Sequence, residues 1–459
     1  MNDQRDQQSR VLLATSLSYV IVILDTSIVN VALKPIAITF QTGVSGLQWV
    51  VNAYTLTFAC LLLTGGALGD RLGAKRIYLA GLLAFSAAST LCGFAPTLSV
   101  LIIARILQGI GAALLVPCSL TLINDAYRKP DERSSAIGKW AGFGGIAMAA
   151  GPLIGGVLID LLGWRSIFLL NVPLALTGAW LTTRVRSNEA AARPTRHLDG
   201  PGQILAIVAL ASSVAVLIQS TEIGWSSRWT IAGSITSVLA WGLFVFVEAN
   251  STEPMLPLRS FKNPVFSAAA FVSMISALVF YGLFFLLSLY FQTIRNWTPL
   301  QTGLAFLPLT LFVTTGSFLS SALSKRHGSL NLVAGGFLLY TIGFLWLQSA
   351  LNNGPYWYIA LCFPVMGFGA GVITPAATTV LMSVIDRSRV GIAAGVLNAS
   401  RQAGSAFGVA IFGALLAGSG AAKEGISSAI SIAIGFSLLA ALGWIVALAW
   451  HARRQDPAK

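Results

Sequence analysis

Three charged side chains lie deep inside long apolar runs of this sequence: Asp25, Arg105 and Arg401. An ionised side chain in a hydrocarbon layer costs several kcal/mol unless it is paired, hydrated or neutralised. Each of the three is therefore a candidate functional residue. A carboxyl group can bind and release a proton, and an arginine can compensate the charge of its ionised form. The alternative is that Asp25 is a structural acid held in one permanent ion pair.

The elements that carry these charges place two of them at the same depth. Counted at 1.5 Å per helical residue, Asp25 lies about 12 Å below the surface at which its run ends, and Arg105 lies about 10 Å below that surface. We therefore predict an ion pair between Asp25 and Arg105, which protonation of the acid would release. Arg401 lies about 16 Å inside its own run, near the midplane. No deep carboxylate occurs in the last six runs, so a carbonyl, water, a ligand or Asp25 is its expected partner.

Polar residues accompany the acid along one helical face. Thr15, Ser18 and Thr26 share a face with Asp25, which suggests that this face borders a polar cavity. Aromatic residues of other runs could line the same cavity, namely Trp49, Tyr54, Tyr281, Phe284, Phe285 and Tyr290. The candidate substrate contacts are Asp25, Asn30, Tyr54, Gln108, Tyr281, Asn398, Arg401 and Gln402.

Composition places the chain in a membrane. Of its 459 residues 55% are hydrophobic and 10% are charged, whereas soluble proteins carry about 25% charged residues. Fourteen apolar runs are long enough to cross a bilayer as helices, so the predicted fold is an all-α polytopic membrane protein. The runs are 11–33, 47–68, 77–95, 98–123, 136–162, 166–183, 202–221, 229–249, 265–291, 301–324, 330–350, 356–383, 390–418 and 427–451.

Two polar linkers divide these runs into groups of six, two and six. The linkers cover residues 184–200 and 248–264 and contain several prolines. The expected organisation is a six-helix bundle in residues 1–183, two additional helices in 184–264, and a second six-helix bundle in 265–459. A leucine, an arginine and a glycine recur at equal spacing after the second run of each group of six, at 68–73 and 323–328. Such paired halves are a common plan among transporters.

The net charge of +13 reflects orientation. Alternate connecting segments, together with both termini, hold 22 of the 29 lysines and arginines. This asymmetry follows the positive-inside rule and predicts that both termini lie in the cytoplasm. The basic segments are expected to face anionic lipid headgroups, and no nucleic-acid partner is needed to explain them.

Several other classes of site and function are disfavoured. The cysteines Cys60, Cys92, Cys118 and Cys362 lie in apolar runs without the spacing of metal ligands, and the histidines His197, His327 and His451 are widely separated. We expect no metal, no cofactor and no disulfide. The sequence contains no GxxxxGK[ST] motif, so nothing in it indicates ATP use. A membrane-embedded enzyme would need a nucleophile–base or metal constellation, which a lone Asp25 does not supply.

The segment 66–76 predicts a tight hairpin on the cytoplasmic side. Its candidate gating residues are Asp70, Arg71, Gly73 and Arg76. Its basic residues, including Lys75, could pair with Asp131 and Glu132 and so form a latch that breaks and re-forms. Anchoring by the positive-inside rule would produce the same pattern.

A glycine-rich fifth run carries the second set of candidate gating residues: Gly151, Pro152, Gly155 and Gly156. Proline removes a backbone donor, and glycines spaced in this way let helices approach closely, so the run could be a bendable gate helix. Plain small-residue packing is the alternative. In the segment 163–171 we expect only Trp164 and Arg165 to matter, as an anchor at the outer interface.

Taken together, these motifs resemble those of the fourteen-span drug:proton antiporters of the major facilitator superfamily. Residues 24–33 resemble the family's first-span signature, 66–76 its cytoplasmic gating motif, 105–111 its proton-transfer motif and 151–156 its antiporter motif. Trp164-Arg165 with residues 171–173, and residues 398–404, also match this group. The resemblance covers essentially the whole chain.

The resemblance implies a function in transport. It implies export of an amphipathic drug or antibiotic across the cytoplasmic membrane while protons enter, by a monomer that uses alternating access of two halves. The alternative is a dedicated transporter of one endogenous metabolite or antibiotic. Lys34 before Pro35, and Ala147 upstream of Gly151, depart from the family pattern. Because the later runs hold no further acids, we expect neutral, zwitterionic or singly charged substrates.

Overall fold

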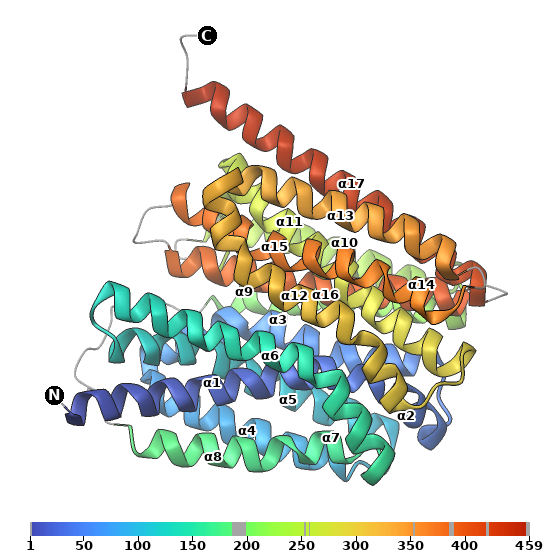
Figure 1. The fold of residues 1–459 in the computed structure, drawn as a ribbon, viewed down its shortest axis with the longest axis horizontal. Coiled ribbons are helices and arrows are strands. Elements are labelled where there is room, and N and C mark those ends of the chain that lie inside the picture. The colour runs from blue at the N-terminus through green and yellow to red at the C-terminus, as the bar shows by residue number, and fades with distance from the viewer. Residues whose placement is uncertain are drawn as a thin grey trace. The chain divides into compact units, whose positions relative to one another are not determined.

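The protein is described by a computed structural model that covers residues 2–185, 199–251, 254–256, 258–351, 354–384, 390–418 and 422–455. These residues are almost entirely helical (Figure 1). The chain divides into two compact units, one formed by residues 1–207 and 291–304 and the other by 208–290 and 305–459. The division into 1–183, 184–264 and 265–459 made from the linkers stays a prediction.

The first unit is built mainly from the helices of the N-terminal half. Their bounds are α1 (Asn2–Val31), α2 (Leu33–Phe40), α3 (Val44–Leu72), α4 (Ala74–Gly93), α5 (Leu98–Ala126), α6 (Pro130–Leu162), α7 (Ser166–Leu169), α8 (Asn171–Thr183) and the start of α9 (Gly200–Ile223). In Figure 1 the long helices run side by side. Helix α5 packs on α1, α3 and α4, and α1 packs on α6 and α8.

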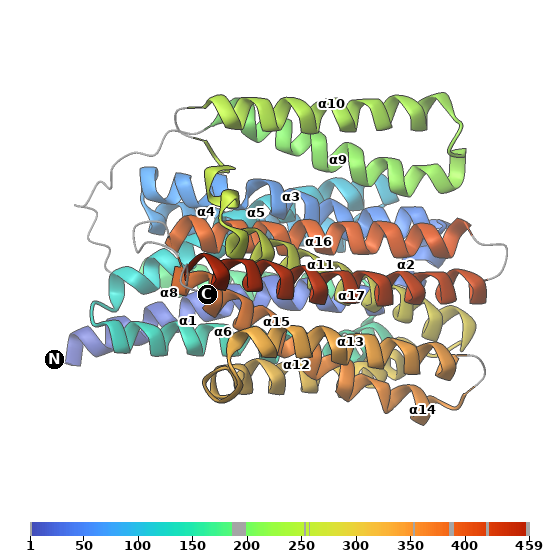
Figure 2. The same ribbon diagram turned by 90° about the horizontal axis from the view of Figure 1, so that it is seen from above.

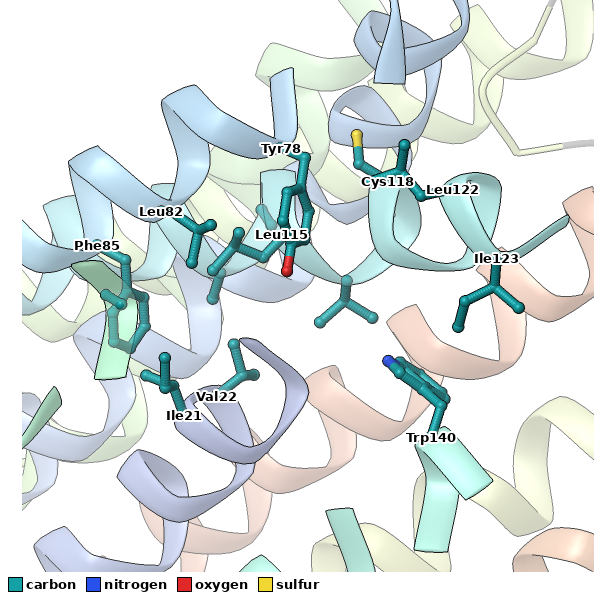
Figure 3. Close-up of a cluster of buried hydrophobic side chains, with 14 of the residues drawn as sticks. Ile21, Val22, Tyr78, Leu82, Phe85, Leu115, Cys118, Leu122, Ile123 and Trp140 are labelled. Carbon is teal, nitrogen blue, oxygen red and sulfur yellow. The ribbon is translucent and has the colours of Figure 1, made fainter. Parts of the chain in front are cut away.

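Buried apolar side chains hold this unit together (Figure 3). Ile21 and Val22 of α1 meet Tyr78 and Phe85 of α4 and Leu115 of α5 in one cluster, and each is at most 1% exposed. Burying a large aliphatic or aromatic side chain stabilises the fold by roughly 1.5–3 kcal/mol. The cluster therefore fixes α1 against α4 and α5, the helices beside Asp25 and Arg105.

Proline and glycine set the ends of several helices. Pro35 has no backbone N–H, and its ring clashes with the preceding turn of a helix, so the first run breaks at Ala32 into α1 and α2. The turn between α3 and α4 places Gly73 at φ +94°, a backbone conformation that favours glycine. Thr97 caps α5 by accepting a hydrogen bond from the Val100 N–H at 3.3 Å.

The second unit contains the remaining helices. Their bounds are α10 (Arg228–Asn250), η1 (Leu258–Lys262), α11 (Pro264–Leu289), α12 (Pro299–His327), α13 (Ser329–Leu351), α14 (Tyr356–Ala360), α15 (Cys362–Val384), α16 (Val390–Gly418) and α17 (Ala422–Gln455). A π-helical turn, η2 (Tyr290–Ile294), follows α11. Figure 2 shows α9 beside α10, and the hydroxyls of Ser213 and Ser237 join these helices at 2.7 Å.

The observed helices agree closely with the predicted runs. Thirteen helical stretches in the described residues are long and apolar enough to cross a membrane. Helix α16, which covers the run predicted at 390–418, has 29 residues but is not one of the thirteen. Its central residues Asn398, Arg401 and Gln402 lower its hydropathy. The fold is that of a polytopic helical membrane protein, with a count of fourteen spans as an approximation.

Candidate functional site

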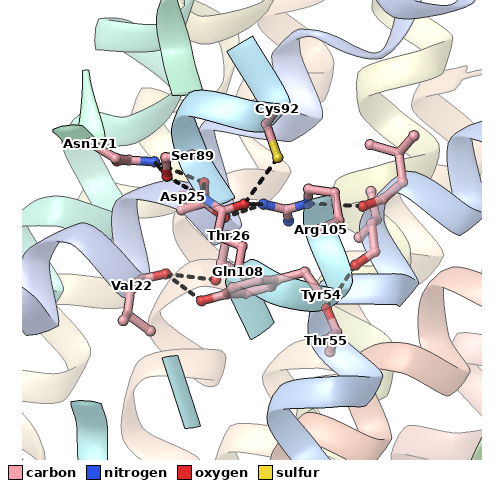
Figure 4. A network of polar contacts seen from close by, with 12 residues as sticks. Val22, Asp25, Thr26, Tyr54, Thr55, Ser89, Cys92, Arg105, Gln108 and Asn171 are labelled. Carbon is pink, nitrogen blue, oxygen red and sulfur yellow. Dashed lines mark hydrogen bonds and ion pairs between the residues drawn. The ribbon is translucent and has the colours of Figure 1, made fainter. Parts of the chain in front are cut away.

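Asp25 lies at the centre of a buried polar network (Figure 4). Its side chain is fully buried. One carboxylate oxygen, Oδ2, accepts a hydrogen bond from Arg105 Nη1, so the predicted ion pair is present. The other oxygen, Oδ1, accepts from Gln108 Nε2 at 2.9 Å and from Asn171 Nδ2 at 3.0 Å. Helices α5 and α8 thus supply three donors to one acid on α1.

Arg105 has partners besides the acid. Its Nε donates to the Val50 carbonyl of α3 at 3.1 Å, and its Nη1 donates to Gln108 Oε1 at 2.7 Å. The guanidinium also lies over the Tyr54 ring, 4.4 Å from the ring centre. Only 1% of the Arg105 side chain is exposed. These contacts would still hold the guanidinium if Asp25 lost its charge, because a carbonyl, an amide oxygen and an aromatic face all attract a cation.

Gln108 connects the acid to a third helix. Its Nε2 also donates to Ser89 Oγ of α4 at 2.7 Å, and Asn171 Nδ2 reaches the same oxygen at 3.5 Å. Cys92 Sγ donates to Gln108 Oε1 at 3.7 Å. Gln108 was predicted as a substrate contact, whereas here it binds the acid and its neighbours. All of these side chains belong to the first unit.

Asn171 is a partner of Asp25 that was not among the candidate site residues. The segment 163–171 was expected to offer only Trp164 and Arg165, yet Asn171 donates directly to Asp25. The signals available were the match of residues 171–173 to the fourteen-span group and the place of this amide inside the apolar run 166–183. Trp164 is 4% exposed and its Nε1 donates to Thr39 Oγ1 at 3.0 Å. It therefore packs inside the protein, and the expectation of an interface anchor was wrong for this residue.

The glycine-rich stretch of α6 packs closely on α1. A Cβ atom built on Gly151 would overlap the Ser27 side chain, and one on Gly155 would lie 2.5 Å from Ile28 Cγ1 and 2.7 Å from Val31 Cγ2. Only glycine permits this approach, because real Cβ contacts are longer. The candidate gate helix therefore lies directly against the helix that carries Asp25.

The candidate hairpin connects α3 and α4, and Asp70, Arg71 and Arg76 are exposed there. Lys75 Nζ donates to the Val185 carbonyl at 2.7 Å and to the Thr183 carbonyl at 3.3 Å. Both carbonyls lie at the end of α8, where helix geometry leaves such groups unpaired. Lys75 thus ties the hairpin to α8.

The predicted latch to the acids of α6 stays a prediction, because two of its members have other partners in this structure. Glu132 pairs with Lys129 in its own helix at 3.0 Å, and Lys75 binds the carbonyls at the end of α8. The Lys129–Glu132 pair is short in sequence and exposed, so it forms without any contribution from the hairpin.

A reciprocal contact joins the start of α1 to the end of α5. The Tyr127 hydroxyl donates to the Gln8 carbonyl at 3.0 Å, and Gln8 Nε2 donates to the Ala126 carbonyl at 3.2 Å. Burial raises the pKa of the Tyr127 phenol, and the charge of Glu132 raises it further. Tyr127 therefore stays a neutral donor across the physiological pH range.

The remaining candidate substrate contacts have local partners. Asn30 Nδ2 donates to the Thr26 carbonyl at 3.1 Å. Arg401 Nη1 reaches Asn398 Oδ1 at 3.4 Å within α16, where both residues and Gln402 are half-buried. Tyr281 lies edge-on to Phe280 with ring centres 5.2 Å apart. Their proposed roles in binding stay predictions.

Two of the predicted cavity-lining aromatics are core residues. Phe284 and Phe285 are at most 1% exposed, and Phe284 stacks on Phe306 with ring centres 4.2 Å apart. Among the described residues no group of three or more histidine, cysteine, aspartate or glutamate side chains could hold a metal ion.

Comparison with known proteins identifies the family. The model of the Major Facilitator Superfamily matches residues 15–409 of this chain. The chain belongs to this transporter superfamily. The resemblance inferred from the motifs is therefore confirmed at the level of the superfamily.

Curated relatives of this transporter are resistance and export proteins. A methylenomycin A resistance protein of Streptomyces coelicolor is 36% identical over 415 residues, which cover 90% of this chain and 87% of the relative. The multidrug resistance protein Stp of Mycobacterium tuberculosis is 35% identical over 406 residues, which cover 88% of this chain and 75% of that protein. A tetracenomycin C resistance and export protein of Streptomyces glaucescens is 31% identical over 407 residues, with the same coverage of 88% and 75%.

Proposed function

We propose that this transporter is a proton-coupled antiporter that exports amphipathic drugs or antibiotics across the cytoplasmic membrane. The observation that carries the proposal is a fully buried carboxylate that receives donors from Arg105, Gln108 and Asn171. An intramembrane acid with a named partner is a functional group by default. The names of the relatives, which refer to antibiotic resistance and export, support the choice of substrate.

Proton binding at Asp25 would change the network in a defined way. A neutral carboxyl attracts the guanidinium much less, so Arg105 would be held mainly by its contacts to Val50, Gln108 and the aromatic rings of Tyr54 and Phe168. The hydrogen bond from Gln108 Nε2 to the carboxyl group would weaken, whereas the bond from Arg105 to Gln108 Oε1 would stay. Because Asp25 lies on α1 and the network reaches α4, α5 and α8, protonation would alter how four helices are held together.

Alternating access requires elements that respond to this change. The proposed gating residues are Gly151, Pro152, Gly155 and Gly156 on α6, which packs on α1, and the hairpin residues Asp70, Arg71, Gly73 and Arg76. The basic connecting segments support an orientation with both termini in the cytoplasm. In that orientation the hairpin faces the cytoplasm and the break at Ala32 faces outward.

The experiment is uptake of a fluorescent amphipathic drug into inside-out vesicles under an imposed proton gradient. We expect gradient-driven uptake by the wild type and its loss in Asp25→Asn. Asp160→Asn is the matched control, since Asp160 is an exposed acid outside the network, and it should transport normally. Gradient-driven uptake that persists in Asp25→Asn would refute the assignment of coupling to Asp25.

Substrate breadth is tested in the same vesicles. Two of the relatives carry the name of a single antibiotic, whereas another is named for multidrug resistance. A panel of neutral, zwitterionic and monocationic drugs therefore separates a broad exporter from a dedicated one. Uptake of one compound only would favour the dedicated transporter, with the proton coupling unchanged.

A further inference from the structure

The break between α1 and α2 exposes two backbone groups that a continuous helix would join to each other. In an uninterrupted α-helix the N–H of residue 34 would donate to the carbonyl of residue 30. Here the carboxamide of Gln292 lies between them. Its Oε1 accepts from the Lys34 N–H at 3.3 Å, and its Nε2 donates to the Asn30 carbonyl at 3.4 Å. One side chain from η2 thus bridges the broken turn.

The Lys34 side chain binds the same segment from the other direction. Its ammonium donates to the Gln292 carbonyl at 2.6 Å and to Asn296 Oδ1 at 3.4 Å. A cation is favoured at the carbonyl end of a helical turn, where backbone dipoles concentrate negative charge. Gln292 is fully buried. Both the backbone and the side chain of Gln292 therefore bind the α1–α2 junction. The first residue that Gln292 contacts there, Asn30, follows Asp25 by five positions.

The connector between α11 and α12 is also held by α6. A Cβ atom on Gly156 would lie 2.6 Å from Leu300 Cα and 2.8 Å from the Pro299 carbonyl oxygen, and one on Gly303 would overlap the Pro152 carbonyl. Residues 291–304 accordingly belong to the first unit, although the chain on both sides of them belongs to the second. We call residues 291–304 the strap.

We propose that Gln292 is a positioning residue for transport. Its carboxamide bridges the broken turn between α1 and α2, and together with Lys34 it holds the strap against the rest of the first unit, at a position we call its seat. The strap must leave this seat for the outer side to open, so these hydrogen bonds set the equilibrium between the closed and the open outer side. This inference rests on the proposed function for its meaning. Its test requires neither a drug nor a proton gradient.

The test measures how often the seat opens. Thr302 lies in the strap and is fully buried, so a cysteine there reacts with a maleimide only when the strap lifts. The full-length transporter is purified in detergent with Thr302→Cys as its single cysteine, the four native cysteines being replaced. We expect Gln292→Met and Lys34→Met to raise the labelling rate roughly ten-fold, since each removes two of the hydrogen bonds that hold the strap. Lys34→Arg keeps a cationic donor and should stay within about two-fold of the parent.

Controls separate opening of the strap from general loosening. Lys129→Met removes an exposed lysine elsewhere, and Gln348→Met removes a glutamine whose amide donates to Ser427 at 3.2 Å; neither should change the rate at Thr302→Cys. The same variants with native Cys118 as the only cysteine, which is 1% exposed, should label as slowly as the parent. An unchanged rate at Thr302→Cys in both Gln292→Met and Lys34→Met would overturn the inference, as would equal acceleration at Cys118. If the labelling rates change as expected but the wild type shows no proton-driven drug uptake, the result would count against the proposed function and leave the inference standing.

Discussion

Removal of Arg105 alone is expected to destabilise the protein strongly. In Arg105→Ala the Asp25 carboxylate keeps the donors of Gln108 and Asn171 but loses its compensating charge. Breaking a buried ion pair by deleting one partner costs about 3–5 kcal/mol, because the other charge stays uncompensated. The double variant Asp25→Asn/Arg105→Ala carries neither charge. Its loss should therefore be smaller than the sum of the two single losses by about 2–3 kcal/mol.

The assay is thermal unfolding of the purified transporter in detergent. For a unit of this size about 3–5 kcal/mol corresponds to a fall in Tm of about 6–20 °C. Lys129→Ala breaks an exposed pair and should cost less than about 1 kcal/mol.

Two results would refute this reasoning. If the single losses of Asp25→Asn and Arg105→Ala simply added in the double variant, the two residues would not be energetically coupled. If Arg105→Met, which keeps most of the side-chain bulk without the charge, were as stable as the wild type, the loss in Arg105→Ala would arise from lost packing against Tyr54 and Phe168, whose rings lie 4.4 and 5.7 Å from the guanidinium.

Three further predictions concern other parts of the first unit. Asn171→Leu removes a hydrogen bond to a charged group, worth about 1.5–3 kcal/mol, so the initial rate of proton-driven uptake should fall about ten-fold or more; a rate within two-fold of the wild type would contradict the role given to Asn171. Gly156→Val would force α6 away from Leu300 and Pro299, and should speed maleimide labelling at Thr302→Cys, whereas unchanged labelling would show that this contact does not hold the strap. Gly73→Ala places a side chain at φ +94°, at a cost of about 1–3 kcal/mol, and should lower Tm by several degrees. Gly66→Ala is its control, because a Cβ there meets Pro117 Cβ at an ordinary 3.5 Å.

The sequence predicted the helices and the central ion pair because both depend on simple distances along the chain. Apolar length locates a span, and the fixed rise of a helix gives the depth of Asp25 and Arg105 within it. The pairing followed because a buried charge needs a counter-charge. Hydropathy alone underestimated α16, whose polar centre at Asn398 and Arg401 is part of the same helix.

The uncharged partners could not be found in this way. Asn171 and Ser89 carry no charge that demands a partner, and depth counting cannot tell which face of α8 or α4 turns toward α1. Gln292 was missed because its contact depends on a break that Pro35 introduces near the end of the first run. Contacts between elements distant in sequence and made by neutral amides appear only once the helices are packed.

The Asp25 network has a consequence for how such transporters diversify. Asp25, Ser89, Arg105, Gln108 and Asn171 all belong to one compact unit. Substitutions in the second unit therefore leave every hydrogen-bond partner of the proposed proton site in place. If the candidate substrate contacts of that unit, such as Tyr281 and Arg401, bind drugs as proposed, selection by a new antibiotic can change specificity there without rebuilding the proton site.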